Sequence, residues 1–266
     1  MSSKRTAVIT GSASGMGAAT AARLRSDGWR VIGIDLEGAE ISADLGTPNG
    51  RDTAIESVAT LVDGSIDALV TWAGLGGFPG RAGSLVASVN YFGTIALLEG
   101  LRPFLANGTE PSAVAIASNS MTCMPGVPLE VTEACLAGDE AAARMAADAS
   151  GSVTAYPATK LAITRWCRNQ APGLDWAGVG IRLNVLAPGA VETPLLAATK
   201  ADPLLGPLFE GFPVPIGRNG SADELAGTVA FLLGPDARFL VGSVLVVDGG
   251  TEAQLRADDL PSPWNP

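Results

Sequence analysis

A tyrosine and a lysine, Tyr156 and Lys160, stand four residues apart in a segment that is predicted to be helical. The pKa of a free tyrosine is about 10, so its hydroxyl is a poor acid or base near neutral pH. Residues four apart lie on the same face of a helix, and the positive charge of Lys160 favours the phenolate. We therefore expect Lys160 to lower the pKa of Tyr156 towards the range that is useful for proton transfer.

A glycine-rich turn, residues 10–17, lies upstream of this pair, between a short apolar segment and a helix-forming segment. We expect Gly11 to make the tight turn, Gly15 to let the backbone approach a pyrophosphate, and Gly17 to allow close packing of helix on sheet. The free N–H groups at the start of the helix would then face the phosphates. The turn predicts a dinucleotide site with these contacts: Gly11, Ser14, Gly15, Met16 and Gly17.

An acidic residue, Asp35, ends the second predicted strand. A carboxylate at this point can accept hydrogen bonds from the adenine-ribose hydroxyls, and it would repel a 2′-phosphate. Residues 12–16 contain no Lys or Arg that could neutralise such a phosphate, so NAD is predicted rather than NADP. Further contacts to this half of the cofactor are predicted at Leu36, Asp44, Leu45, Ala73 and Gly74.

Composition excludes several classes of function. A chain of 266 residues with 47% hydrophobic residues is of ordinary size for one α/β domain. The net charge of −10, without a cluster of Lys and Arg, argues against a nucleic-acid partner. The absence of histidine rules out a Ser-His-Asp or Cys-His nucleophile and removes the commonest zinc ligand. Cys123, Cys135 and Cys167 have no CxxC spacing, so we expect free thiols in a reducing cytoplasm and no metal site.

Short apolar segments alternate with longer helical ones, the pattern of a parallel sheet that is covered on both faces. Strands are predicted at residues 7–10, 31–35, 68–71, 113–117, 182–186 and 244–247. Helices are predicted at residues 18–26, 53–62, 85–105, 155–170 and 222–233.

Three segments depart from this alternation: an insertion at 121–151 with a helical stretch at 139–148, a proline- and leucine-rich segment at 193–220, and a C-terminal tail at 251–266. Long segments inside a domain are often lids or binding loops, although each of the two internal segments, 121–151 and 193–220, could also simply pack on the surface. The N-terminus has no signal-peptide pattern, and we find no apolar run that approaches the length of a membrane span. A soluble, cytoplasmic protein without a membrane partner is predicted.

The motifs occur in the order found in the short-chain dehydrogenase/reductase family, which the chain resembles over nearly its whole length. In chain order, these motifs are residues 10–17, Asp35, Asp44-Leu45, Ala73-Gly74, Asn90, a serine after Ile116, Tyr156 with Lys160, Pro188-Gly189 and Thr193. The resemblance implies a single-domain Rossmann fold over residues 1–266, that is, a doubly wound parallel α/β sheet with helices on both faces. Within the family, residues 33–36, 88–93 and 182–189 are similar to bacterial 3α-hydroxysteroid dehydrogenase/carbonyl reductases.

The chain departs from the family pattern at one position and offers two candidates at another. Where the family usually has Asn-Ala-Gly, this chain has Trp72 before Ala73 and Gly74. The supporting hydrogen bonds of the asparagine are therefore lost, and the sequence leaves the geometry of this loop undetermined. The catalytic serine of the family aligns with Ser118. Ser120 remains an alternative, because a shift of two residues keeps a strand side chain on the same face.

The resemblance implies hydride transfer between an alcohol carbon and C4 of the nicotinamide. Tyr156 is the implied general base for oxidation and general acid for reduction, and Lys160 lowers its pKa and binds the nicotinamide ribose. The serine would stabilise charge on the substrate oxygen, and Asn90 would position the lysine through a water. The implied contacts around the nicotinamide are Pro188, Gly189, Val191 and Thr193.

The apolar residues of 193–215, together with residues 121–128, would form the wall of a substrate pocket. The expected substrate is a hydrophobic secondary alcohol or ketone, with a hydroxysteroid as the most specific expectation. The alternatives are a non-catalytic NAD-binding module and a short-chain reductase of non-steroid carbonyls. Enoyl reductases and sugar epimerases fit less well, because their Tyr–Lys or glycine spacings differ. The family resemblance further implies a homodimer or homotetramer that forms through the long helices, although the insertion directly precedes one such helix and could block that contact.

Overall fold

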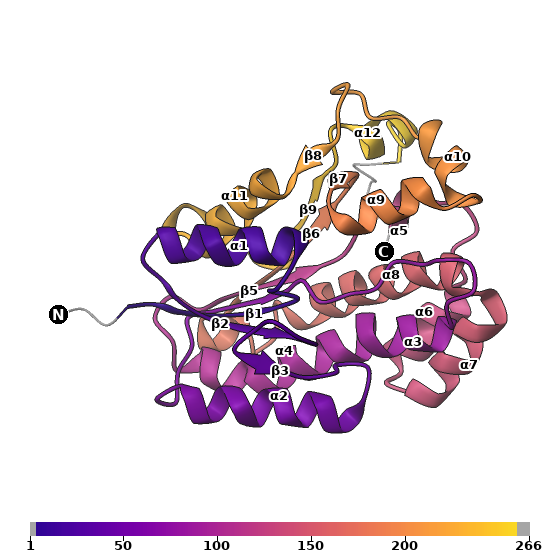
Figure 1. Cartoon of the computed structure of the whole chain (residues 1–266). Coiled ribbons are helices and arrows are strands. Elements are labelled where there is room, and N and C mark those ends of the chain that lie inside the picture. The colour runs from indigo at the N-terminus through magenta and orange to yellow at the C-terminus, as the bar shows by residue number, and fades with distance from the viewer. Residues whose placement is uncertain (1–3, 260–266) are drawn as a thin grey trace.

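A parallel sheet of seven strands forms the centre of the structure, a computed structural model in which residues 4–259 are described. Neighbouring strands follow the order β3-β2-β1-β4-β5-β6-β9, and every pair in this sheet is parallel (Figure 1). The strand order reverses between β1 and β4, which is where ligands bind in sheets of this kind. The strands are β1 (Thr6–Thr10), β2 (Arg30–Asp35), β3 (Ile41–Ser42), β4 (Ala68–Thr71), β5 (Ser112–Ile116), β6 (Arg182–Pro188) and β9 (Val244–Val247).

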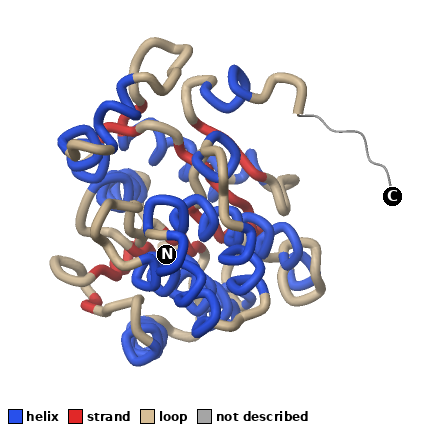
Figure 2. The backbone as a smooth tube through the Cα atoms, turned by 90° about the vertical axis from the view of Figure 1, so that its right-hand side faces the viewer, coloured by secondary structure: helices blue, strands red, loops and turns tan. Residues whose placement is uncertain are grey.

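Helices cover both faces of the sheet, as Figures 1 and 2 show. In β1, Ala7 and Ile9 belong to the apolar layer under α1 and α11, whereas Val8 belongs to the layer under α2, α4 and α8. Burial on both faces explains why the strands are continuous apolar runs without polar alternation. These helices are α1 (Gly15–Ser26), α2 (Pro48–Leu61), α4 (Thr94–Ala106), α8 (Ser152–Gln170) and α11 (Ala222–Leu233).

Side-chain caps fix where several helices begin. The Thr47 hydroxyl accepts the N–H of Gly50 at 3.1 Å and is followed by a proline, which is favourable at the first helical position of α2. Ser221 and Glu224 form a reciprocal capping box at the start of α11.

One long helix contains a change of hydrogen-bonding pattern. It consists of α3 (Gly83–Ala87), a π-helical turn η1 (Ser88–Gly93) and α4. By length and composition this helix could cross a membrane, so the prediction that no apolar run approaches such a length is wrong here. Of its apolar window, 61% is buried inside the fold, as in the core helix of a globular domain.

The insertion forms three helices: α5 (Ser120–Cys123), α6 (Leu129–Leu136) and α7 (Glu140–Ser150). α6 and α7 pack against each other and against α8, and α7 also packs against α3. The predicted helical stretch 139–148 corresponds to α7.

The second long segment forms α9 (Pro194–Ala201) and α10 (Leu205–Glu210), which lie beyond the carboxyl ends of the strands (Figure 1). Its two ends are joined by a small parallel sheet of β7 (Val191–Glu192) and β8 (Gly220–Ser221).

The predicted α/β fold, a doubly wound parallel sheet, is confirmed, and all six predicted strands are present to within one or two residues. Helices α1 and α2 begin earlier than predicted, at Gly15 and Pro48, and the two-residue strands β3, β7 and β8 were not predicted. Of the tail, α12 (Thr251–Leu255) is described, whereas residues 260–266 lie outside the described part. The remaining short helices are η2 (Ala177–Val179) and η3 (Pro235–Ala237).

The contact between α3 and α7 can be tested at Gly83. A Cβ atom on Gly83 would lie 1.9 Å from the carbonyl oxygen of Ala147, so backbone would have to move. We expect Gly83→Ala to lower the free energy of unfolding by about 1–3 kcal/mol, measured by denaturant titration. Gly211→Ala is the control, since a Cβ there meets nothing within 4 Å, and we expect a change of no more than about 0.5 kcal/mol. Equal stability of the two variants would contradict the packing of α3 on α7.

Candidate active site

A cleft with a cavity volume of about 320 Å³ opens at the carboxyl ends of the strands. Its polar lining comes from the segment that follows β5 and from α8, and the start of α1 and the loops that follow β4 and β6 also line it. The cleft therefore lies at the point of strand-order reversal where such sheets bind ligands. It brings together these predicted site residues: Met16, Gly74, Ser118, Tyr156, Lys160, Pro188, Gly189, Val191 and Thr193.

Tyr156 and Lys160 lie one turn apart on α8, and both line the cleft. The Lys160 ammonium lies 5.8 Å from the centre of the Tyr156 ring and donates a hydrogen bond of 3.0 Å to the carbonyl of Ile116. Lys160 is only 4% exposed, and burial lowers its pKa to about 8. The carbonyl at the end of β5 is thus the partner of a buried cation.

The pKa of Tyr156 differs from the sequence-based expectation. Removal from water raises the pKa of its hydroxyl, and a hydrogen bond with Ser118 lowers it by less, so the net change is upward. The expected lowering by Lys160 is not found. The ammonium is directed to the Ile116 carbonyl, and the loss of hydration disfavours the phenolate.

The structure distinguishes the two candidate serines. Ser118 follows β5, lines the cleft beside Tyr156 and partly offsets the rise in the pKa of that tyrosine, and its hydroxyl accepts the N–H of Ser120 at 3.1 Å. The Ser120 hydroxyl is buried at the start of α5, without a hydrogen-bond partner in the described part of the chain. This geometry favours Ser118 as the residue next to the substrate oxygen.

Asn90 lies in the π-turn η1 and is fully buried. Its side-chain amide holds the backbone of Leu75, accepting the N–H at 2.7 Å and donating to the carbonyl at 2.9 Å. A Cβ on Gly74 would lie 3.3 Å from Asn90 Oδ1 and 3.4 Å from Lys160 Nζ. Asn90, Lys160 and the loop after β4 therefore meet around Gly74, where little space is left beside the backbone.

The glycine-rich turn has the geometry that a dinucleotide needs. Gly11 and Gly15 have φ angles of +67° and +53°, which favour glycine. A Cβ on Gly17 would lie 2.0 Å from the carbonyl of Gly11, so this position also requires glycine. Ser14 is the N-cap of α1 but makes no side-chain cap bond, so the N–H groups of the first turn have no capping side chain.

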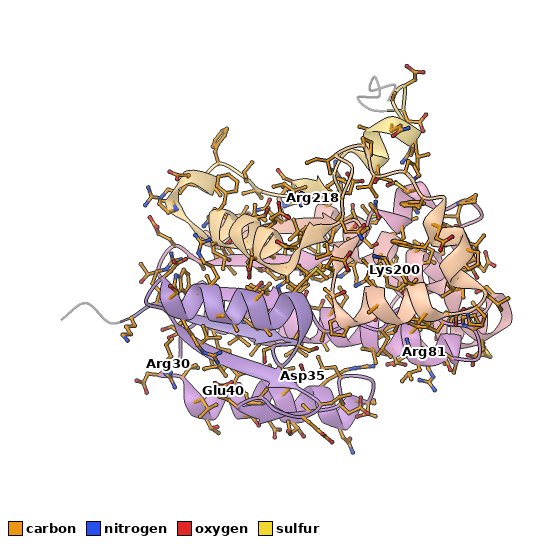
Figure 3. The ribbon with its side chains drawn as sticks, turned by 45° about the horizontal axis from the view of Figure 1, so that its top comes forward. Arg30, Asp35, Glu40, Arg81, Lys200 and Arg218 are labelled. Carbon is orange, nitrogen blue, oxygen red and sulfur yellow. The ribbon has the colours of Figure 1, made fainter. Side chains whose placement is uncertain are left out.

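The carboxylate of Asp35 is fixed at the end of β2, under the start of α1 (Figure 3). It accepts the N–H of Ala13 at 2.9 Å and that of Leu36 at 2.8 Å. Asp35 is thereby tied to the glycine-rich turn, where a carboxylate can meet a ribose. The Leu36 side chain is exposed.

The loop after β3 contains Asp44, which is exposed and accepts the N–H of Gly46 at 2.9 Å. Leu45 is buried in the core, at 6% exposure, and its carbonyl accepts a buried hydrogen bond from Arg51 Nε at 2.8 Å.

The loop that follows β4 keeps its close approach although Trp72 replaces the asparagine common in the family. Thr10 accepts the N–H of Ala73 at 3.0 Å, and a Cβ on Gly11 would lie 2.7 Å from the same nitrogen. The Trp72 side chain is 8% exposed and packs in the layer under α1. The loop is therefore anchored from β1.

Thr193 caps α9, accepting the N–H of Leu196 at 3.2 Å and donating to the carbonyl of Val191 at 3.1 Å. It also faces the glycine-rich turn, since a Cβ on Gly15 would lie 3.7 Å from its methyl group. A Cβ on Gly189 would lie 2.4 Å from Asp248 Cβ, so the turn after Pro188 requires glycine.

The apolar wall of the cleft comes mainly from the segment 193–220, as predicted from its leucines and phenylalanines, and Met124 is the member of 121–128 that lines it. Sequence reasoning missed some residues of the wall, because they flank motifs without belonging to one: Leu75, Gly76, Gly77 and Val153. Within residues 4–259, no group of three or more His, Cys, Asp or Glu side chains could hold a metal ion, and all three cysteines are free thiols.

Comparison with known proteins agrees with this geometry. A family model described as Enoyl-(Acyl carrier protein) reductase matches residues 141–252. A 3-alpha-hydroxysteroid dehydrogenase/carbonyl reductase of Comamonas testosteroni is 40% identical over 252 residues, which cover 94% of this chain and 97% of the relative. A cis-4-hydroxycyclohexanecarboxylate dehydrogenase of Sinomonas cyclohexanicum is 30% identical over 280 residues, with 94% and 97% coverage.

The crystal structure of the 3-alpha-hydroxysteroid dehydrogenase from Pseudomonas sp. B-0831, complexed with NADH, superimposes with a TM-score of 0.91. It is 49% identical and covers 95% of this chain and 99% of that one. Both the sequence relatives and this structure span nearly the whole chain. The chain therefore belongs to the short-chain dehydrogenase/reductase family.

Proposed function

We propose that the protein is an NAD-dependent oxidoreductase that interconverts a hydrophobic secondary alcohol and its ketone by hydride transfer. The observation that carries the proposal is that Ser118, Tyr156 and a buried Lys160 line one cleft that also has an apolar wall. The relatives from Comamonas and Sinomonas, both named as dehydrogenases of ring-bearing molecules, support the same class of reaction.

The residues present fit NAD. The uncapped first turn of α1 would bind the pyrophosphate, with Gly17 allowing the approach. Asp35 would accept hydrogen bonds from the adenine-ribose hydroxyls, and residues 12–16 offer no cation for a 2′-phosphate. The NADH in the Pseudomonas relative supports this choice. Bound NAD would supply the acceptor for the hydride at C4 of its nicotinamide.

The chain's own residues would move the proton. In oxidation, the phenolate of Tyr156 would take the proton of the substrate hydroxyl while the carbon that bears this hydroxyl gives up a hydride to the cofactor; in reduction, that carbon would receive the hydride and the phenol would return the proton to the carbonyl oxygen. The Ser118 hydroxyl would donate a hydrogen bond to the substrate oxygen as charge develops on it. Lys160 would hold the nicotinamide ribose, and Asn90 would keep the loop at Leu75 and Gly74 in place beside it.

The apolar wall favours a bulky hydrophobic substrate, and we propose a hydroxysteroid or the corresponding ketone. The wall is formed by these residues of α9, α10 and the loop that follows: Leu195, Leu196, Leu205, Leu208, Phe209 and Phe212. The Comamonas relative is named for carbonyl reduction as well, which favours reduction of non-steroid carbonyls as a second activity of the same cleft. We further propose a cytoplasmic homodimer or homotetramer, as is usual in the family.

The role of Tyr156 is tested by Tyr156→Phe, which removes the hydroxyl and keeps the ring. We expect turnover to fall by about 10²–10⁴-fold, because the proton-transfer group is lost. The Kd of NADH, measured by fluorescence titration, should stay within about twofold of the wild-type value. Tyr91→Phe is the matched control, since Tyr91 is the other tyrosine of the chain and is buried in the core. Full turnover by the Tyr156 variant would contradict the assignment.

The choice between the serines is tested by comparing Ser118→Ala with Ser120→Ala. We expect Ser118→Ala to lower kcat by about 10²–10³-fold, as for loss of an oxyanion donor. Oxidation needs the phenolate, so its rate rises with pH through the pKa of Tyr156. Loss of the hydrogen bond that lowers this pKa should move the inflection to higher pH. A larger effect from Ser120→Ala would reverse the assignment.

Cofactor preference is tested by Asp35→Ala. Loss of the carboxylate should raise the ratio of kcat/KM for NADP to that for NAD by roughly tenfold or more, the value of a hydrogen bond to a charged group. Glu37→Ala removes a nearby exposed carboxylate and controls for general electrostatic effects. If both variants changed the ratio equally, the ribose contact of Asp35 would be disproved.

A further inference from the structure

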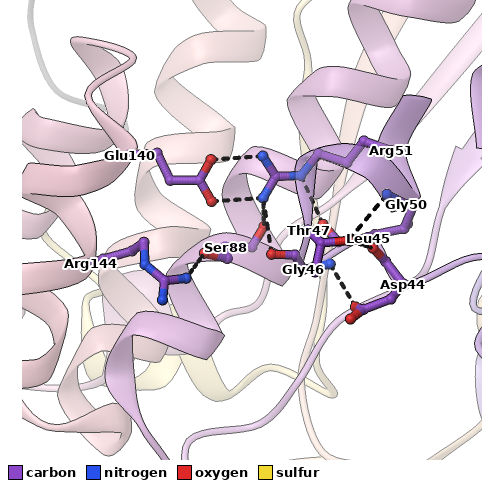
Figure 4. Close-up of polar contacts among 9 residues, drawn as sticks. All are labelled: Asp44, Leu45, Gly46, Thr47, Gly50, Arg51, Ser88, Glu140 and Arg144. Carbon is purple, nitrogen blue, oxygen red and sulfur yellow. Dashed lines mark hydrogen bonds and ion pairs between the residues drawn. The ribbon is translucent and has the colours of Figure 1, made fainter. Parts of the chain in front are cut away.

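A buried arginine of α2 joins three segments that are distant in sequence (Figure 4). Arg51 is 7% exposed, and its Nε donates to the carbonyl of Leu45 at 2.8 Å. One Nη donates to the carbonyl of Ser88 at 3.1 Å. Both Nη atoms also donate to the carboxylate of Glu140, each at 2.7 Å. The planar guanidinium thus fixes the loop after β3, the π-turn and the start of α7 relative to one another.

Each of the first two segments belongs to the proposed cofactor site. Leu45 lies in the loop with Asp44, which is proposed to face the adenine. Ser88 is the first residue of the π-turn that carries Asn90, whose amide holds the loop at Leu75. A displacement of Arg51 would therefore release both the adenine side and the support of the nicotinamide side.

The third segment belongs to the insertion and supplies the counter-charge. A buried guanidinium is costly without an anion, and Glu140 is that anion. The hydrogen bond from Arg51 lowers the pKa of Glu140, so its carboxylate stays ionised at neutral pH. One turn further along α7, Arg144 donates to the Ser88 hydroxyl at 2.6 Å. The insertion therefore contacts the π-turn at two points.

We propose that Arg51 and Glu140 are positioning residues of the cofactor site, through which the insertion helix α7 holds residues 44–46 and the π-turn in the conformation that binds NAD. This inference rests on the proposed function, since it takes the loop at Asp44 and Leu45 as the adenine contact. The insertion then contributes to cofactor binding and does not merely pack on the surface.

The test is Glu140→Gln in the full-length protein, which keeps the shape of the side chain and removes its charge. ADP-ribose, which is the cofactor without its nicotinamide, is the probe, and its Kd is measured by calorimetry beside that of NADH. We expect both Kd values to rise about tenfold, the equivalent of one charge-assisted hydrogen bond. KM for NAD should rise similarly while kcat stays within about twofold, because no reacting group is changed.

Two variants separate positioning from general stability. Asp148→Asn is the matched control, since Asp148 lies on the same helix but accepts the N–H of Ser84 at 2.7 Å, away from the adenine loop. We expect its ADP-ribose affinity to equal that of the wild type. Glu140→Asp keeps the charge on a shorter side chain and should restore part of the affinity.

A double variant covers the case in which Glu140→Gln fails to fold. Arg51→Met with Glu140→Met replaces the ion pair by an apolar pair, an exchange that is often neutral for stability. We expect a free energy of unfolding near that of the wild type, but ADP-ribose binding that is still about tenfold weaker. Wild-type affinity in the folded variants would overturn the positioning role and leave the proposed function intact. A wild-type protein that neither bound NADH nor oxidised any alcohol would overturn both.

Discussion

A buried positive charge at the end of the sheet is the constraint on which the cleft depends. The Lys160 ammonium is almost completely removed from water, so it needs a partner, and the carbonyl of Ile116 provides one. This bond requires α8 to lie close against β5. The same approach places Tyr156, one turn away, beside Ser118, which follows β5. The position of the Tyr156 hydroxyl thus depends on where the cation is held.

The parts of the fold that the sequence predicted are those with a repeating local signal. Parallel strands buried on both faces are continuous apolar runs, so β1, β4 and β9 could be placed to within a residue. Strands of two residues, such as β3 and β7, carry no periodicity and were missed. The π-turn was missed as well, because the apolar pattern of 85–105 reads as one uninterrupted helix.

The residues of the site also divide into those that the sequence could predict and those that it could not. Motif residues such as Gly17 and Asp35 could be predicted because each belongs to a motif with a defined local backbone geometry. The pKa of Tyr156 could not, since it depends on how completely the fold removes the hydroxyl from water and on where the ammonium of Lys160 is directed. The pairing of Arg51 with Glu140 could not be predicted either. The two residues are 89 positions apart in the sequence, and each alone has the pattern of an ordinary charged residue on a helix surface.

The π-turn has a consequence for how the chain can vary in length. Its wider hydrogen-bonding ring accommodates one more residue than an α-helical turn does. Loss of a single residue between Ser88 and Gly93 would restore regular bonding, but it would rotate one half of the helix against the other by about 100°. Either Asn90 would leave the loop at Leu75, or Leu98 and Leu101 of α4 would turn away from the core. The number of residues in this helix therefore determines both how α4 packs in the core and where Asn90 lies beside the cleft. The helix tolerates substitutions far better than deletions.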